Sequence, residues 1–178
     1  MTVNKLWKNE LKHHKFLLKL WSSLPMPSYE NSYSNHQLNK RILYSAIIMR
    51  KLWEDQKNGE KKAAASLKNN SLTKLSMPPL KLLHYEITAY KYLFIGEPDY
   101  IIEKVFPENY GASEKVFLKS NELLNQIIHS FVYGIANKDS KPLGFLVASD
   151  KSKTDCLYLV EFKEYIRTIE FFIENSSI

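Results

Sequence analysis

The chain has 178 residues, of which 44% are hydrophobic and 13% aromatic, so it can bury one sizeable core and is too short to require a second domain. Its single cysteine, Cys156, excludes an internal disulfide framework and a cysteine-rich zinc site. The net charge of +6 is unevenly distributed: residues 1–75 carry 14 Lys/Arg against 5 Asp/Glu, and residues 76–178 carry 11 against 14. We therefore predict one domain, residues 1–178, with a basic N-terminal part. Such a basic part is typical of chains that bind RNA or an acidic protein partner, although Lys-rich surfaces also occur without either.

The first predicted element is an amphipathic helix from Val3 to Trp21. Its lysines interrupt the apolar run, so the segment lacks the continuous apolar core of a secretory signal. No later segment reaches the roughly 20 apolar residues that are needed to span a bilayer. We expect a cytoplasmic protein with no membrane partner, whose first helix packs into its own domain; a position on a membrane surface is the alternative. Its core-facing positions are Val3, Trp7, Leu11, His14, Leu18 and Trp21.

Residues 22–35 contain two prolines among Ser and Asn residues and are predicted to form a loop. A second helix is expected from His36 to Lys57, with Asn35 as its N-cap. Its middle, ILYSAIIM, is apolar almost all round, which predicts that this helix is the central one of the fold.

Arg50 directly follows this apolar stretch. An arginine in that position needs a partner, because burial of an unpaired charge is very costly. Glu54 lies one helical turn further along and can supply the partner. An ordinary ion pair within the helix is therefore the simplest role for these two residues.

Two segments in the middle of the chain are less regular. Residues 57–76 are polar and basic and are predicted to form a mobile segment within the domain, either a loop or a short exposed helix. The run LKLLHYEITAYKYLF, residues 80–94, has apolar residues three to four apart, as in a helix, and also apolar residues at every second position, as in a strand. We predict a helix. Pro98 can begin a further short helix that reaches Phe106.

A long helix is predicted from Ser113 to Ala136, with a core-facing stripe that includes Phe117, Leu124 and Ile128. Beyond it the pattern changes to two short strands, residues 144–149 and 155–162, which form a hairpin. The chain then ends in an amphipathic helix whose apolar face includes Tyr165, Ile169 and Phe172. Together these elements predict a mainly α protein: a helical bundle with a small C-terminal β-hairpin at residues 144–162 and a final helix.

The chemical candidates lie in the segment NELLNQIIHSF. Asn125 and His129 are four residues apart, so a helix places them on one line beside the core stripe. The chain has no phosphate-binding glycine loop, no HExxH zinc motif, no paired cysteines and no GxSxG motif, and we therefore predict neither a cofactor nor a metal. A structural interpretation is equally open, in which His129 is a partly buried histidine with a hydrogen bond to Asn125 or Ser130.

An Asn and a His four residues apart on a late helix resemble the motif of the HEPN superfamily, helical bundles that handle nucleotides and RNA in bacterial defence and toxin systems. In that motif an arginine commonly precedes the Asn, and Leu124 occupies its position in this chain. The stretch SAIIMRKLWED, residues 45–55, also resembles an early helix of HEPN-like proteins, so Arg50 could supply the guanidinium. The resemblance implies a helical bundle, RNA as the partner, and a homodimer.

The resemblance also implies metal-independent RNA cleavage, in which a ribose 2′-OH attacks the adjacent phosphate. His129 would move the proton and Arg50 would stabilise the charge that develops on the phosphate oxygens. Asn125 would orient His129 or bind the phosphate. The candidate catalytic residues are therefore His129, Asn125, Arg50 and Glu54.

Three functions remain open at this point. The first is a HEPN-like RNA-binding protein or ribonuclease of a bacterial defence or toxin-type system, which the basic N-terminal part favours. The second is a catalytically silent interaction protein, such as an immunity, antitoxin or regulatory component, which Leu124 favours. The third is a structural adaptor that uses the aromatic-rich helices.

Overall fold

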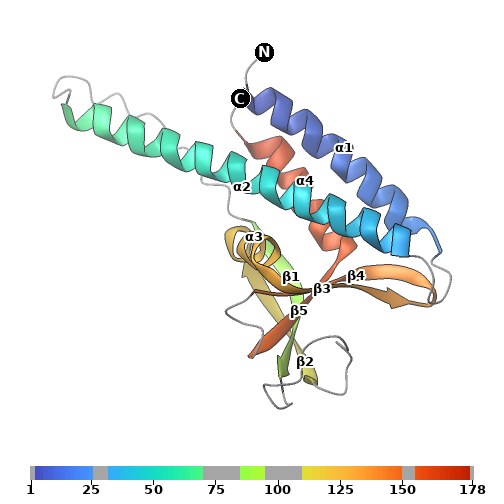
Figure 1. Cartoon of the computed structure of the whole chain (residues 1–178). Helices are drawn as coiled ribbons and strands as arrows, with labels where there is room; N and C mark the ends of the chain where they lie inside the picture. Colours follow the sequence, from blue (N-terminus) through green and yellow to red (C-terminus); the bar gives the residue numbers. More distant parts are fainter. Residues whose placement is uncertain (1–2, 26–31, 70–84, 95–109, 150–154, 177–178) are drawn as a thin grey trace.

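The structure is a computed structural model that describes residues 3–25, 32–69, 85–94, 110–149 and 155–176. These residues form four helices and five strands, and α1, α2 and α4 lie together on one side of the sheet (Figure 1). The elements follow in the order α1 (Val3–Ser23), α2 (Ser32–Asn69), β1 (Glu86–Phe94), β2 (Tyr110–Lys119), α3 (Ser120–Ile128), β3 (Ser130–Lys138), β4 (Lys141–Ser149), β5 (Cys156–Glu161) and α4 (Phe162–Asn175).

The strands form one antiparallel sheet in the order β2-β1-β5-β4-β3. Two hairpins, β1–β2 and β3–β4, are joined through the central strand β5. Successive side chains of a strand point to opposite faces, and the face that includes Ile87, Leu118 and Phe145 is buried against the helices. This face of the sheet and the three helices enclose the hydrophobic core.

The predicted mainly α bundle with a small hairpin is wrong, because the described residues contain a five-stranded sheet. The described part of the expected helix 80–94 is strand β1, and residues 80–84 lie outside the described residues. The expected helix from Ser113 to Ala136 is divided into β2, α3 and β3, and its proposed core residue Phe117 is 65% exposed on β2. The apolar residues of both segments are spaced in a way that suits a helix as well as a strand. The pairing of β1 with β2 and β5 favours the strand conformation.

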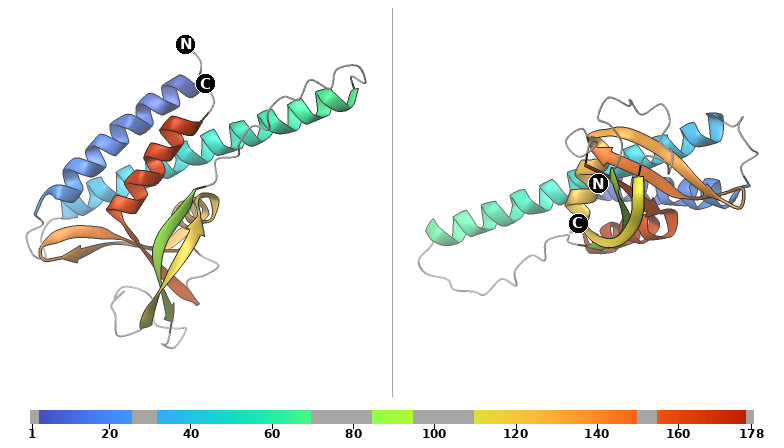
Figure 2. Two further views of the ribbon diagram at one scale, coloured as in Figure 1. Left: turned by 180° about the vertical axis from the view of Figure 1, so that it is seen from behind. Right: turned by 90° about the horizontal axis from the view of Figure 1, so that it is seen from below.

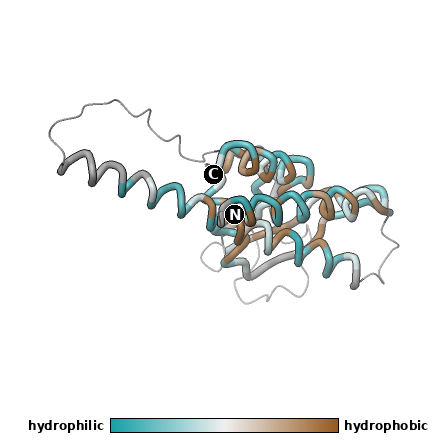
Figure 3. Tube along the Cα trace, turned by 90° about the horizontal axis from the view of Figure 1, so that it is seen from above, coloured by the Kyte–Doolittle hydropathy of each residue, from teal (hydrophilic) through white to brown (hydrophobic). Residues whose placement is uncertain are grey.

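The second helix is longer than the sequence pattern indicates. Helix α2 begins at Ser32, so Asn35 lies inside it instead of capping it, and it continues to Asn69 through much of the segment expected to be mobile. Residues 70–76 of that segment, and the short helix expected from Pro98 to Phe106, lie outside the described residues. The extension is rich in Ala and Lys, which favour helix without any hydrophobic face. Its end projects away from the body of the protein (Figure 2), and the part of this projection that is coloured in Figure 3 is mainly hydrophilic.

Other predicted elements are confirmed. Helix α1 covers the expected N-terminal segment, and α4 buries Tyr165, Ile169 and Phe172. Strands β4 and β5 occupy nearly the expected positions and pair antiparallel, but each also pairs with a further strand.

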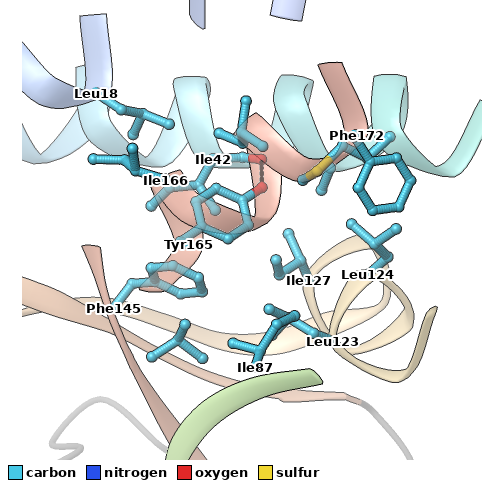
Figure 4. Packing of buried hydrophobic residues seen from close by; sticks show 14 of the residues in the cluster. Leu18, Ile42, Ile87, Leu123, Leu124, Ile127, Phe145, Tyr165, Ile166 and Phe172 are labelled. Carbon is cyan, nitrogen blue, oxygen red and sulfur yellow. Dashed lines mark hydrogen bonds between the residues drawn. The ribbon is translucent and has the colours of Figure 1, made fainter. Parts of the chain in front are cut away.

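Tyr165 connects the helices to the sheet at the centre of the core (Figure 4). Its hydroxyl donates a hydrogen bond to the backbone oxygen of Ile42 at 3.0 Å and lies 2.9 Å from Ser45 Oγ on α2. Its ring lies edge-on to Phe145 of β4, with 5.1 Å between centroids. Complete burial raises the pKa of Tyr165, so the side chain is a neutral phenol that satisfies buried polar groups of α2.

The backbones of β4 and β5 approach each other closely at Gly144, and a substitution there tests this contact. A Cβ at this position would overlap the backbone oxygen of Val160 and lie 2.9 Å from Glu161 Cα. We expect Gly144→Ala to lower the free energy of unfolding by about 1–3 kcal/mol in urea denaturation, because backbone atoms cannot move aside cheaply. Gly134→Ala is the matched control, since nothing lies within 4 Å of its Cβ position. Equal urea midpoints for the two variants would show that the β4–β5 contact is looser than described.

Candidate functional site

The site begins on α2, where the buried part of the helix ends. Met49 and Leu52 are buried on the core side, and Trp53 is only 9% exposed. Arg50 lies at the edge of this face with a partly exposed side chain. Its Nε donates a hydrogen bond to Glu54 Oε1 at 2.6 Å, so the ion pair predicted within the helix forms.

Helix α3 provides the opposite side of the site. Its first turn is held by a hydrogen bond from the Lys119 backbone N–H to Glu122 Oε2, at 3.1 Å. Leu123, Leu124 and Ile127 are buried, which turns the line of Glu122, Asn125 and His129 outward. The predicted position of Asn125 and His129 beside the core stripe is therefore confirmed.

Arg50 joins the two helices. Its Nη1 donates a hydrogen bond to Asn125 Oδ1 at 2.5 Å, across 75 residues of sequence. The Glu54 and Asn125 bonds use two of the five guanidinium N–H groups, which leaves three without a partner among the described residues. The guanidinium also lies over the ring of Trp53, with 5.1 Å from Cζ to the ring centroid. The cation is thus held in one orientation while part of it still faces solvent.

His129 lies where α3 changes directly into β3. Its backbone N–H bonds to the carbonyl of Asn125 at 3.0 Å, which makes it the C-cap of the helix. Its side chain is exposed, so the interpretation of His129 as a partly buried histidine is wrong. Because residues four apart on a helix are neighbours, the imidazole belongs to the same surface as Asn125.

A groove continues along the seam between α2 and the α3–β3 junction. Its volume is about 460 Å³, and it combines apolar walls with a lysine, a histidine and a serine. It is lined by His36, Asn39, Lys40, Leu43, Tyr44, Ile127 and Ser130.

Comparison of the chain with protein-family models, with curated proteins and with solved structures found no match. Within the ranges that the structure covers, no helix combines the length and hydropathy required to cross a membrane.

The structure therefore brings together Arg50, Glu54 and Asn125, and it puts His129 one turn away on the same side of α3. Sequence reasoning missed Trp53, which lies between Arg50 and Lys57; the Lys57 Nζ is 4.7 Å from its ring centroid. The position of Trp53 three residues after Arg50 and four before Lys57 was the signal in the sequence that could have found it, because residues at these spacings are neighbours on a helix. The groove could not be found in this way, because its walls come from separate parts of the chain.

A second polar cluster lies between α1 and α2, in a cleft of about 420 Å³ lined partly by Trp7 and Arg41. His14 is 6% exposed there, in agreement with its predicted core-facing position. Its burial, followed by the positive charges of Arg41 and His13, lowers its pKa to about 4; Glu10 opposes this shift. The folded protein therefore holds His14 neutral at neutral pH.

This lowered pKa predicts a loss of stability in mild acid. The unfolded chain binds a proton at His14 below about pH 6.5, whereas the folded chain resists protonation until about pH 4. The stabilisation is complete above pH 6.5 and falls with pH, and we expect a loss of about 2 kcal/mol between pH 7.5 and 5. Urea denaturation at both pH values should show a smaller difference for His14→Gln, whereas His36→Gln, which changes an exposed histidine of α2 that does not contribute to the shift, should retain it. The same pH dependence in wild type and His14→Gln would exclude this origin.

Proposed function

We propose that the protein is RNA-associated and that Arg50, Asn125 and His129 contact the phosphodiester backbone. The hydrogen bond between Arg50 Nη1 and Asn125 Oδ1 supports this most directly, because it holds a cation beside the outward line of α3. A guanidinium with free N–H groups is a strong phosphate donor. The basic composition of residues 1–75 supports the same partner.

The proposed chemistry is metal-independent cleavage. The 2′-oxygen of a ribose forms a bond to the adjacent phosphorus as the bond from phosphorus to the 5′-oxygen breaks. His129 takes the proton from the 2′-OH as general base, water supplies the proton that the leaving 5′-oxygen gains, and Arg50 stabilises the negative charge on the phosphate oxygens. Glu54 acts as a positioning residue, and Asn125 does so as well as contacting the phosphate, since the side-chain oxygen of each accepts a hydrogen bond from Arg50.

Arg50, Asn125, His129 and the basic residues 1–75 support an RNA partner, whereas the fold does not support membership of the HEPN superfamily. The HEPN resemblance implied a helical bundle, and the described residues form a sheet covered by helices instead. What remains of the resemblance is the Asn–His spacing and an arginine supplied by another helix. A role in a bacterial defence or toxin-type system stays a proposal that follows from that motif.

The nuclease proposal is tested with single-stranded RNA in excess EDTA. We expect the wild-type protein to cleave it, His129→Ala to lose about 10²–10⁴-fold in rate, and Arg50→Gln about 10²–10³-fold. His13→Gln and Arg167→Gln are matched controls, because His13 is an exposed histidine of α1 and Arg167 an exposed arginine of α4 paired with Glu164. Circular dichroism should show that all four variants fold. Equal cleavage by wild type and His129→Ala would assign the activity to another source and end the catalytic proposal.

A second function is favoured by different observations. Leu124, at the position of the motif arginine, is completely buried and can contribute only to packing. On the outer face of α2, Leu43, Tyr44 and Ile47 are 40%, 45% and 46% exposed, which is unusual for large apolar side chains on one helix face. We infer from these features a catalytically silent interaction protein that uses this face of α2, including in the homodimer that the resemblance implied.

Light scattering after size-exclusion chromatography tests this interaction face. We expect a mass near twice the 20.8 kDa of one chain, and a return to the single mass in Ile47→Lys, because a charge in an apolar interface is costly. Phe16→Lys is the control, since Phe16 is 63% exposed but lies on α1. A monomeric wild-type protein would argue against self-association through α2.

A further inference from the structure

The face of the sheet opposite the helices has a distinctive surface near the β2 edge. Helices α1, α2 and α4 pack against one face of the sheet, and β1 and β2 extend away from them (Figures 1 and 2). On the opposite face Leu157 and Leu159 of β5 are buried, and the exposed part lies towards β2. The period of two along paired strands puts Thr88 and Tyr90 of β1 on this opposite face, next to Phe117 and Lys115 of β2. Lys119, at the end of β2, follows on the same side.

Phe117 is the unusual residue of this surface. It lies within β2, two residues before the end of the strand, and is 65% exposed, the largest exposed fraction among the described large apolar side chains. Exposure of this ring does not stabilise the fold, because full burial of a Phe side chain would contribute favourably to the free energy of folding. Lys115 Nζ lies 5.8 Å from its ring centroid, so a cation and an open aromatic face are presented together.

The charges around Phe117 favour an anionic partner. Lys115 and Lys119 flank it along β2 at intervals of two residues, and both are exposed. Glu86 lies opposite Lys119 in the register. Further across the sheet Lys163 is paired with Glu161 at 2.7 Å. Lys163 is thus neutralised by Glu161, and Glu86 and Glu122 lie near Lys119, so the positive charge of this surface is carried mainly by Lys115, next to the ring.

We propose that this surface, Thr88, Tyr90, Lys115, Phe117 and Lys119, is a stacking platform for single-stranded RNA. An exposed aromatic ring takes an unpaired base, and the neighbouring lysines take the phosphates on either side; duplex RNA offers no free base to stack. Strand β2 runs directly into α3, which carries Asn125, so the platform and the proposed phosphate site belong to adjoining parts of the fold. The platform rests on the proposed RNA function and adds to it a preference for single strands.

The test is the fluorescence anisotropy of a labelled 2′-O-methyl oligouridine about ten nucleotides long, which lacks the 2′-OH nucleophile and stays intact. Phe117→Ala should weaken binding roughly tenfold through the loss of one stacked base. Phe117→Trp should keep the affinity, and its added tryptophan fluorescence should be quenched by the oligonucleotide. Leu93→Ala is the matched control, because Leu93 is 53% exposed on β1 but on the opposite side from Tyr92, and it should bind like wild type. A duplex of the same length should bind less tightly than the single strand.

Other outcomes separate the platform from the proposed function. If Phe117→Ala binds as tightly as Leu93→Ala while Arg50→Gln binds weakly, the platform is overturned and the RNA site at Arg50 stands. If the wild-type protein does not bind the oligonucleotide at all, both fail. If Phe117→Ala instead changes the mass in light scattering and leaves RNA binding unaltered, the surface is a protein contact and the platform is overturned.

Discussion

The hydrogen bonds of Tyr165 bring the separate parts of this fold together. The residue belongs to α4, yet its hydroxyl satisfies the backbone of α2 at Ile42 and its ring packs against Phe145 in the sheet. A buried phenol in an apolar core must find such partners, because an unpaired polar group would cost about 1–3 kcal/mol. The position and rotation of α2 over the sheet are therefore restricted at one point in its N-terminal half.

The candidate site is a consequence of that restriction. Once α2 is fixed, Met49 and Leu52 enter the core and Arg50 is left at its boundary, above α3. Helix α3 is only nine residues long and would be unstable alone, so its own position depends on three buried side chains and on its connection to β1, where the Ser120 backbone N–H bonds to the Tyr85 oxygen at 2.8 Å. The contact between Arg50 and Asn125 thus depends on the whole core, although both residues lie at the surface.

The two proposed RNA contacts also differ in how they are built. Arg50 is oriented by Glu54, Asn125 and Trp53 before any ligand arrives, which lowers the cost of binding a phosphate. Phe117 is 65% exposed on its strand beside one neighbouring lysine, so it suits a sequence-tolerant base contact. The rigid cation on α2 suits the positioning of a phosphate, and the open aromatic ring on β2 suits the stacking of a base.

The sequence by itself determined the elements whose apolar period is unambiguous: α1, the buried middle of α2, α4 and the strands β4 and β5. It also determined the Arg50–Glu54 pair and the outward line of Asn125 and His129, because these depend on spacing within one helix. Only the tertiary structure decided that residues 86–94 and 110–119 are strands, since their patterns suit both periods and the deciding hydrogen bonds come from segments far along the chain. For the same reason it alone decided that Phe117 faces solvent and that Arg50 reaches Asn125: a contact across 75 residues follows from packing, which no local pattern encodes.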